Sequence, residues 1–452
     1  MQQLPILTID LCTSKIISIA AKQSSNNQIT VLAVGYSSAA GIKKGKITNM
    51  DLATLSIKQS MDNLRQMYSG EFAKIYVNIP SVSAQTYNSK AMVNVPSGKI
   101  STKEIKTVLK TAIHNTAISS DYEILHAIAN NFIIDGSFIQ DPQSYITNHL
   151  EAKANIIAVS KNYLNNIRQA LRDYGFDSLN FVVNSYVAGQ ALSNANSDEH
   201  YNFQNGHLVI DIGSSCTYAS IYKGKSCVFS KFYPIGGNNI SKDIALMLNT
   251  KIEDANTFKE NHASIIVNDD EAKQKVRFPN ATNDNSFTEV SAEYLSTIIH
   301  CRLEELFYLI KDDIEEHNMF NAFKSGIILS GGSSKIEGIK KLCFKIFENQ
   351  RVVKLDTGLV LPNDYFDLKD PRYSTAVALV KYALDTNPHY EIDSTKNLRA
   401  KQEVIEPPKP SPSIIPQKPT PPKRQTGDTQ SNESSHKQGF LKKIIGLLDK
   451  HL

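Results

Sequence analysis

Cysteine is scarce in this 452-residue chain, and its five copies show no pairing pattern. They are Cys12, Cys216, Cys227, Cys301 and Cys343. Their spacing argues against a disulfide framework and against a cysteine-based metal site. No apolar run reaches the roughly 18 residues that a membrane-spanning helix needs. We expect no signal peptide, because residues 1–5 lead into a strand without a basic start or a cleavage site. The net charge of +4 is too small and too dispersed to indicate a nucleic-acid partner. These features predict a cytoplasmic protein.

One motif occurs twice, about 200 residues apart. Residues 7–15 and 208–217 each contain an apolar run ending in an aspartate (Asp10, Asp211), then a turn of small and hydroxyl residues, and each is followed by a second apolar run. This pattern predicts a β-hairpin whose turn offers N–H groups and hydroxyls to an anion, with a carboxylate that can hold a cation. Either copy alone is better explained as an ordinary hairpin with an aspartate in its turn. The two copies together predict a duplicated fold with a ligand between its halves.

A third motif contains a glycine pair. Residues 326–339 give a buried-type strand, the turn Gly331–Gly332, and the start of a helix. Glycines allow a ligand to approach the backbone, and the helix offers unpaired N–H groups at its start. A simple strand-to-helix connection is the alternative. In this order, the three motifs resemble the nucleotide motifs of the actin, sugar-kinase and Hsp70 superfamily.

Flanking segments narrow the resemblance to one family. Residues 371–379, 41–47 and 235–240 are similar to segments of the bacterial cell-division actin homologue FtsA, and so is the end of the chain. The resemblance covers roughly residues 4–385 and the last fifteen. It implies a two-lobed α/β fold of the actin type with the displaced subdomain peculiar to FtsA, a disordered Pro-rich linker and a C-terminal amphipathic helix.

The order of expected elements gives the domain boundaries. We expect a first-lobe core at 1–81 and 161–180, an inserted subdomain at 82–160, a second-lobe core at 181–235 and 326–385, a small second-lobe subdomain at 236–325, a Pro-rich linker at 386–438 and the amphipathic helix at 439–452. Within the insertion we expect strands near 89–95, 133–134 and 152–158 and a helix near 103–116, opened by a Ser101–Glu104 capping box. The small subdomain should carry a long helix near 288–316.

The resemblance implies ATP with Mg²⁺ between the lobes. Asp10 and Asp211 would approach the Mg²⁺ through water. The residues expected on the phosphates are Thr13, Ser14, Lys15, Gly213, Ser214, Ser215 and Thr217. Gly331, Gly332 and Ser333 would lie against the adenosine, and Glu253 is a further candidate for the ribose or base side.

The chain departs from the superfamily pattern around the phosphates. Cys12 stands where glycine is usual, residues 214–216 replace Gly-Gly-Thr, and Tyr218 replaces a common aspartate. These side chains should narrow the site. Residues 182–189 carry no carboxylate that could act as a general base. We therefore expect nucleotide binding with weak or no ATPase activity.

Two further surfaces are expected to bind partners. In the family, the small subdomain receives the C-terminal tail of the tubulin homologue FtsZ, and Arg302 and Glu305 match charged positions on that surface; an ordinary solvated helix face is the alternative. The inserted subdomain would bind other division proteins, and the chain would assemble with itself into an actin-like filament.

The end of the chain predicts a helix lying on a membrane. At 100° per residue, apolar side chains of residues 439–452 form one stripe, with lysines opposite. The expected membrane-contacting residues are Phe440, Leu441, Lys442, Lys443, Ile444, Ile445, Leu447 and Leu448. The partner would be anionic lipid of the inner membrane.

These expectations give one leading function and two alternatives. The leading one is an ATP-binding, polymerising adapter that tethers FtsZ filaments to the cytoplasmic face of the inner membrane at the division septum. The alternatives are a hydrolysing ATPase or kinase of the same superfamily, and the related pilus-assembly actin homologue, which lacks the terminal amphipathic helix on a Pro-rich tether.

Overall fold

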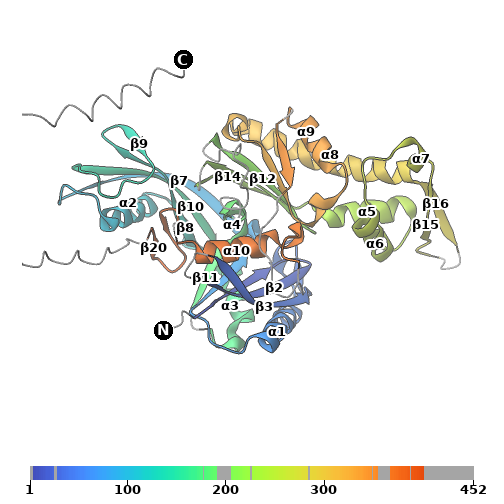
Figure 1. Ribbon diagram of the computed structural model, residues 1–452, viewed down its shortest axis with the longest axis horizontal. Coiled ribbons are helices and arrows are strands. Elements are labelled where there is room, and N and C mark those ends of the chain that lie inside the picture. The colour runs from blue at the N-terminus through green and yellow to red at the C-terminus, as the bar shows by residue number, and fades with distance from the viewer. Residues whose placement is uncertain are drawn as a thin grey trace, which may run out of the picture. The chain divides into compact units, whose positions relative to one another are not determined.

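The computed structural model describes most of the chain as far as residue 401. The described residues are 4–24, 28–176, 178–190, 205–223, 226–282, 286–348, 350–354, 367–386 and 388–401. They belong to one compact unit, residues 1–402 (Figure 1). Most of the predicted linker and the whole predicted amphipathic helix, 439–452, lie outside the described residues.

The first predicted motif lies in a five-stranded sheet. In spatial order its strands are β11 (Leu179–Val183), β6 (Lys74–Ile79), β1 (Ile6–Leu11), β2 (Lys15–Gln23) and β3 (Ile29–Ser38). Strands β1, β2 and β3 are antiparallel neighbours, whereas β6 and β11 run parallel to β1. Every residue of β1 is buried, as is typical of a strand covered on both faces.

Short connections and helices surround this sheet. Strand β3 leads into the small hairpin β4 (Ile42–Lys43) and β5 (Lys46–Ile47), and then into α1 (Met50–Met67), which packs on β2 and β3. The side chain of Asn49 caps α1 by accepting a hydrogen bond from the Leu52 N–H. Helix α3 (Lys161–Ala170) is followed by a 3-10 turn at residues 172–174, which is closed by the left-handed Gly175.

The second lobe repeats the strand order of the first. Its sheet contains β14 (Ser226–Tyr233), β13 (Thr217–Lys223), β12 (His207–Ile212), β17 (Ile327–Ser330) and β18 (Val352–Lys354). Three antiparallel strands are again followed by two parallel ones. Helices α4 (Asn184–Gln190), α9 (Ile339–Ile346) and α10 (Ser374–Leu384) complete the two cores. The predicted duplication is confirmed.

The inserted residues form a separate sheet with its own core. Its elements are β7 (Ala84–Asn94), α2 (Thr102–His114), β8 (Tyr122–Ile134), β9 (Ser137–Ile139) and β10 (His149–Ser160). The expected Ser101–Glu104 capping box is present. Strand β8 is far longer than the expected 133–134, because its mixed apolar sequence becomes a strand only through pairing with β10 along its whole length.

The start of the predicted linker needs correction. Strands β19 (Glu391–Ile392) and β20 (Leu398–Arg399) extend the inserted sheet, in the order β20-β19-β8-β10-β7. Glu391 and Ile392 pair with β8. The fold therefore continues beyond residue 386, as far as the last described residue, 401.

The small second-lobe subdomain is mostly helical. It contains α5 (Gly237–Leu248), α6 (Ile252–His262), α7 (Asp269–Ala272), the hairpin β15 (Lys275–Pro279) with β16 (Phe287–Ser291), and α8 (Ala292–Glu316). Helix α8 begins later than the expected residue 288, because residues 287–291 pair with β15 and Ser291 caps the helix.

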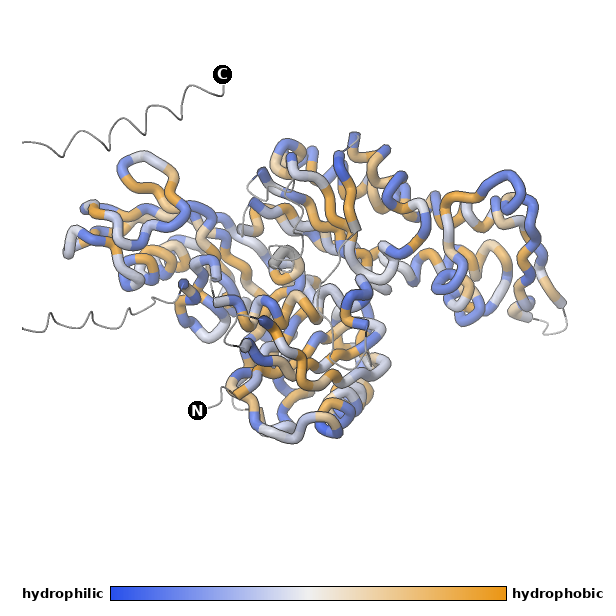
Figure 2. Tube along the Cα trace, in the orientation of Figure 1, coloured by the Kyte–Doolittle hydropathy of each residue, from blue (hydrophilic) through white to orange (hydrophobic). Residues whose placement is uncertain are grey.

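Hydrophobic residues gather along the strands of both five-stranded sheets (Figure 2). One buried cluster combines the first-lobe sheet with α10 and reaches Val209, Tyr222 and Ile328 of the second lobe. The small subdomain shares a second cluster with the second-lobe sheet, and the inserted sheet packs with α2 in a third. The first and second lobes are therefore joined by a continuous core beneath the candidate site.

Candidate functional site

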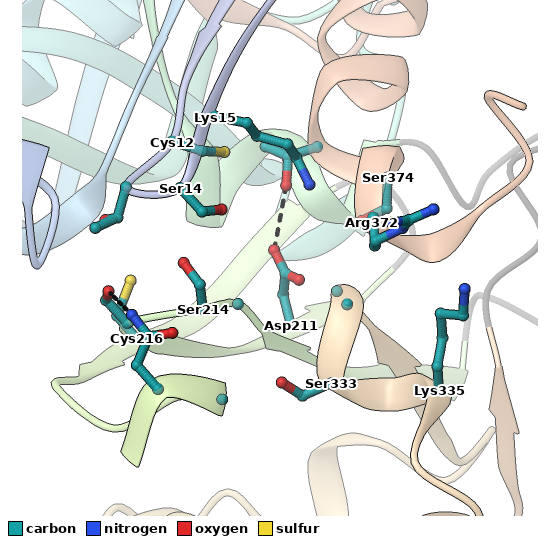
Figure 3. Close-up of a pocket in the computed structure, with 18 of the residues that line it drawn as sticks. Cys12, Ser14, Lys15, Asp211, Ser214, Cys216, Ser333, Lys335, Arg372 and Ser374 are labelled. Carbon is teal, nitrogen blue, oxygen red and sulfur yellow. Dashed lines mark hydrogen bonds between the residues drawn. The ribbon is translucent and has the colours of Figure 1, made fainter. Parts of the chain in front are cut away.

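The three predicted nucleotide motifs line one cavity of about 610 Å³ (Figure 3). This volume lies within the usual range for sites that hold small molecules. The predicted site residues that line it are Thr13, Ser14, Lys15, Asp211, Gly213, Ser214, Ser215, Gly331, Gly332 and Ser333. Asp10, Thr217 and Glu253 do not line it.

The first turn is shaped by its own hydrogen bonds and by the β4–β5 hairpin. The Cys12 N–H donates to the Lys15 carbonyl at 3.1 Å, which closes the turn between β1 and β2. The Thr13 hydroxyl accepts a hydrogen bond from the Gly45 N–H at 3.2 Å. The Lys15 ammonium lies 4.9 Å from the ring centroid of Tyr373, which directly precedes α10. This contact links the first turn to the segment before α10.

Asp10 is buried directly behind this turn. One of its carboxylate oxygens accepts a hydrogen bond from Asn78 Nδ2 at 2.7 Å, and the other accepts one from the Cys12 thiol at 3.3 Å. Burial raises the pKa of Asp10, although both hydrogen bonds oppose the shift. Burial and the nearby Asp10 also raise the pKa of Cys12 far above its usual value, so this thiol stays protonated and serves as a donor.

Asp211 lines the cavity itself (Figure 3). Its carboxylate accepts a hydrogen bond from the Thr375 hydroxyl at 3.2 Å. Burial raises its pKa to about 6, and the Asp10 carboxylate contributes to that rise. Gly331 has a φ of +80°, and a Cβ there would collide with the Asp211 carboxylate, so only glycine suits this turn.

The second turn is bound to the start of α5. The Gly237 N–H donates to the Gly213 carbonyl at 2.9 Å, and the Asn238 N–H donates to the Ser214 carbonyl at 2.6 Å. A Cβ at Gly237 would come within 2.6 Å of the Ser333 hydroxyl, so the close approach of these turns needs glycine. Thr217 is fully buried, and its hydroxyl donates to the Ile235 carbonyl. Its predicted contact with phosphate is replaced by this structural hydrogen bond.

The glycine pair leads into a different element from the one expected. Residues Gly332–Lys335 form a 3-10 turn, in which the Ser334 N–H donates to the Gly331 carbonyl, and α9 begins only at Ile339. The predicted helix start beside the glycines is wrong. The left-handed Gly338 explains the delay, because it separates the turn from the helix.

Helix α6 contributes side chains that the sequence analysis missed. Asn256, Lys259 and Glu260 line the cavity. The Lys259 ammonium donates to the Asn256 side chain at 2.7 Å and to the Gly237 carbonyl at 3.3 Å, and burial lowers its pKa. Glu253 lies one turn earlier on the helix and is exposed. Helical spacing relates residues 253, 256 and 260, but it does not tell which end of the face meets the cavity.

A charged cluster lies at the rim beside the glycine pair. Asp370 accepts from the Lys335 ammonium at 2.8 Å and pairs with Arg372 at 3.0 Å. Burial alone would raise the pKa of Asp370, but Lys335 and Arg372 outweigh it and hold the pKa at about 2. Lys335 and Arg372 both line the cavity, so two cationic side chains, each paired with Asp370, stand at this end. Both residues lie in segments singled out in the sequence, 326–339 and 371–379, but neither side chain was expected at the site.

The donor set suits a hydrated cation carried by a ligand. Among the described residues, no group of three or more histidine, cysteine, aspartate or glutamate side chains could hold a metal ion. Asp10 and Asp211 nevertheless lie close enough for each to affect the other electrostatically. Mg²⁺ often keeps several waters and binds through one or two carboxylates plus the phosphates of a nucleotide, so these two carboxylates are compatible with it.

The predicted partner-binding pair occupies the seam between α8 and α5. Arg302 forms a two-pronged ion pair with Asp243 of α5, at 2.6 and 2.8 Å, and a further contact with Glu305 at 2.5 Å. The Arg302 side chain is 26% exposed and that of Glu305 is 51% exposed. Arg302 therefore also stabilises the subdomain, whereas Glu305 is the more accessible charge.

The predicted membrane-contacting residues, between Phe440 and Leu448, lie outside the described residues. In the part of the chain that is described, no helix is long and apolar enough to span a bilayer.

The chain is similar to solved structures of actin-like proteins. It aligns with a PilM–PilN complex of type IV pilus biogenesis at a TM-score of 0.59 and 14% identity, over 84% of this chain and 98% of the other. It aligns with MreB5 of Spiroplasma citri bound to AMPPNP at a TM-score of 0.52 and 14% identity, over 84% and 96%. At such low identity these similarities show the fold alone, which is actin-like.

Sequence comparisons identify the family. A model of the cell division protein FtsA matches residues 208–378, and a model of the SHS2 domain inserted in FtsA matches residues 83–158. Cell division protein FtsA of Pseudomonas aeruginosa is 26% identical over 84% of this chain and 89% of its own length. FtsA of Borreliella burgdorferi is 28% identical over 83% and 90%. The two family models together match more than half of the residues, and the relatives align along most of their length. These matches show that the chain belongs to the FtsA family of cell division proteins.

Proposed function

We propose that this protein is a division adapter that binds Mg²⁺–ATP in the cavity and links FtsZ filaments to the inner membrane. The observation that carries the proposal is the convergence of three motifs, distant in sequence, on one cavity. Hydroxyls and backbone of the two hairpin turns would bind the phosphates, and Gly332 and Ser333 would contact the adenosine, with Lys259 and Glu260 opposite. The solved MreB5 structures with AMPPNP and with ADP support nucleotide as the ligand of this fold.

Mg²⁺ would be held by the nucleotide phosphates and, through waters, by Asp10 and Asp211. The ion would neutralise phosphate charge that Lys15 alone cannot balance. The protein residues would orient the phosphates between two lobes that share a core. Nucleotide can then favour one arrangement of the lobes over another by the difference in its affinity for the two.

The side chains that line the cavity favour ATP binding without ATP hydrolysis. Asn184 lines the cavity, but its carbonyl oxygen accepts hydrogen bonds from the Ser81 N–H at 3.0 Å and from the Ser81 hydroxyl at 2.6 Å. Its remaining NH₂ group is a donor and cannot remove a proton from water. Cys12 is a protonated thiol. The described carboxylates that line the cavity are Asp211, Glu260 and Glu337; the proposal assigns Asp211 to the cation, and Glu260 and Glu337 lie toward the proposed adenosine side. No carboxylate would then remain beside the phosphates as a general base, which usually contributes about 10²- to 10⁴-fold.

The FtsZ tail would bind over the α5–α8 seam. Glu305 is exposed there, and Leu309 follows one turn later on the same face of α8, 40% exposed. On α5, Met247 lies one turn after Asp243 and is 54% exposed. Charges beside accessible apolar side chains suit a short peptide with both kinds of residue. Residues 439–452 would supply the membrane contact as an interfacial helix.

Vesicle co-sedimentation of the full chain tests the proposal. The protein should sediment with anionic vesicles and bring an FtsZ tail peptide with it in the presence of Mg²⁺–ATP. Changing Phe440 and Leu448 to Asp should release the protein, because each buried side chain contributes about 1.5–3 kcal/mol. Glu305→Lys should reduce peptide capture up to about tenfold and leave sedimentation intact. Glu315→Lys is the matched control, because Glu315 is an exposed carboxylate near the C-terminal end of the same helix, α8. Sedimentation of the Phe440→Asp/Leu448→Asp variant with the vesicles would refute the membrane contact.

A further inference from the structure

A buried amide at the end of β6 lines the cavity with one hydrogen-bonding atom unused. Asn78 is 1% exposed. Its Nδ2 donates to Asp10 Oδ1 at 2.7 Å, and this bond fixes the amide orientation, because two facing oxygens would repel each other. Its Oδ1 has no hydrogen-bond partner among the described residues, and no other described residue that lines the cavity has a buried side-chain polar atom in this state.

The unused oxygen requires a hydrogen-bond donor. Leaving a buried acceptor unsatisfied is costly, so such atoms usually bind a ligand or a water. A phosphate oxygen carries no proton at neutral pH and would repel Oδ1. Waters bound to a divalent cation are strong hydrogen-bond donors, and such a water would satisfy the Oδ1 acceptor of Asn78.

The position of Asn78 identifies which water it would bind. Asn78 is the register partner of Asp10 across the parallel β1–β6 pair, so both side chains leave the sheet at the same level. Asp10 stands directly behind the first phosphate-type turn. We propose that Asn78 is a positioning residue of the cation site: Nδ2 orients the Asp10 carboxylate, and Oδ1 accepts a hydrogen bond from a water of the nucleotide-bound Mg²⁺. This inference rests on the proposed binding of Mg²⁺–ATP.

The test separates the cation from the nucleotide. The dissociation constant of AMPPNP is measured by calorimetry with the full chain, once with Mg²⁺ and once with EDTA. The constant in EDTA divided by the constant with Mg²⁺ is the ratio that reports how much the cation contributes to binding. Asn78→Leu, which is close in size, should reduce this ratio about tenfold, as expected for loss of a residue that orients a metal site. The affinity in EDTA should stay unchanged.

The chain offers a matched control. Asn155, in β10 of the inserted sheet, is 2% exposed, donates from Nδ2 to Asn88 at 3.3 Å, and also has an unpartnered Oδ1 among the described residues. It does not line the cavity. Asn155→Leu should change stability in a similar way and leave the ratio as in the unmodified protein. Asn78→Ala removes the same two polar atoms without adding apolar branches at the cavity wall, so it should also reduce the ratio, and it serves if Asn78→Leu does not fold.

The outcomes distinguish this inference from the proposed function. An unchanged ratio in folded Asn78→Leu or Asn78→Ala, or an equal loss of affinity with and without Mg²⁺, would overturn the role of Asn78 while nucleotide binding stands. Absence of AMPPNP binding by the unmodified protein would overturn both proposals.

Discussion

Asp10 and Asp211 end equivalent strands, but their carboxylates have different surroundings. Asp10 accepts from Asn78 and Cys12 and does not itself line the cavity, whereas Asp211 lines the cavity and accepts from Thr375. The duplication of the backbone therefore does not extend to the side chains. The two acids can take unequal parts in holding a cation.

Gly332→Val should weaken nucleotide binding about tenfold or more. A Cβ at Gly332 would lie 3.2 Å from Arg372 Cγ, so the larger valine side chain must displace Arg372 or enter the cavity. Calorimetric titration with AMPPNP measures the loss, and the melting temperature without nucleotide checks the fold. Unchanged affinity in a folded Gly332→Val variant would remove this turn from the adenosine side of the site.

Acid should destabilise the fold through His207. This residue in β12 is 1% exposed and stacks on Tyr222, and burial lowers its pKa from 6.5 to about 4. Because the folded state holds the neutral form, the unfolded state binds the proton first as the pH falls below 6.5. The contribution to the free energy of unfolding should then fall by up to about 1.4 kcal/mol per pH unit until about pH 4, roughly 3 kcal/mol in all.

Denaturant unfolding at several pH values measures this effect. His207→Phe keeps the aromatic stack and removes the titrating group, so its stability should decline less between pH 6.5 and 4. Parallel pH profiles for the two proteins would contradict the assignment to His207.

Most of the candidate site residues were predictable because they sit in short motifs. The turns at 13–15 and 213–215 and the glycine pair are local in sequence, and each lines the cavity. Lys259 and Asn78 were not predictable, because they reach the cavity from elements whose orientation depends on tertiary packing, and nothing in their neighbours marks them. Arg372 lies in the family-like segment 371–379, but the sequence of that segment does not show that its side chain lines the cavity.

At the scale of elements, α4 and α10 connect the cavity to a buried charged cluster. Helix α4 begins with Asn184 at the cavity, and α10 begins with Ser374 and Thr375. Further along, Tyr186 of α4 and Tyr382 of α10 each donate to the Glu391 carboxylate at 3.0 Å. The cluster thus ties the segment after residue 386 to the cores of the lobes.

The inserted sheet takes part in the same cluster. The Val183 N–H donates to His126 Nε2 at 3.1 Å, so the ring proton lies on Nδ1, which contacts Glu391 at 2.5 Å. Arg399 pairs with Glu391 at 3.6 Å and lies 3.6 Å from the Tyr382 ring centroid. Burial would raise the pKa of Glu391, but its neighbours outweigh burial and keep the pKa below its usual value. Glu391 is therefore ionised in the interior.

Glu391→Gln should destabilise the protein by about 3–5 kcal/mol, because it leaves the buried Arg399 without its counter-charge. Denaturant unfolding measures the change, and amide exchange should show faster opening of residues 391–399. Glu348→Gln breaks an exposed ion pair with Lys311 and is the control, expected to cost at most about 1 kcal/mol. Equal effects of the two substitutions would mean that the cluster adds no stability.

The sequence predicted the type of an element correctly where the local pattern of residues decides it. The prediction failed where pairing with another strand decides it. The capped α2 and the two Asp-ended hairpins form as expected. Strand β16 was taken as helix, and β19 and β20 as linker. These strands are only two to five residues long, and each forms because a partner strand supplies its hydrogen bonds: β15 for β16, β19 for β20, and the distant β8 for β19.

At the scale of the whole molecule, the two lobes face one ligand site, and the proposed nucleotide position leaves no described carboxylate free to act as a general base beside the phosphates. Steady-state ATP turnover by the full chain should stay well below about one per second, the lower end for working enzymes. A phosphate-release assay measures it. The Asp211→Asn variant identifies contaminating activity, since any residual rate that it retains does not come from this cavity. A rate above one per second that Asp211→Asn abolishes would favour the hydrolysing alternative.

The pairing of β19 with β8 also constrains how the chain is made. His126 and Glu391 are 265 residues apart, so at roughly 5–20 residues per second the ribosome needs about 13–53 seconds to supply the partner of β8. During that interval the edge of β8 at residues 127–128 presents unpaired backbone groups beside a sheet that can otherwise be complete. The nascent protein is therefore most prone to mispairing after its inserted subdomain has folded and before its last strands have emerged.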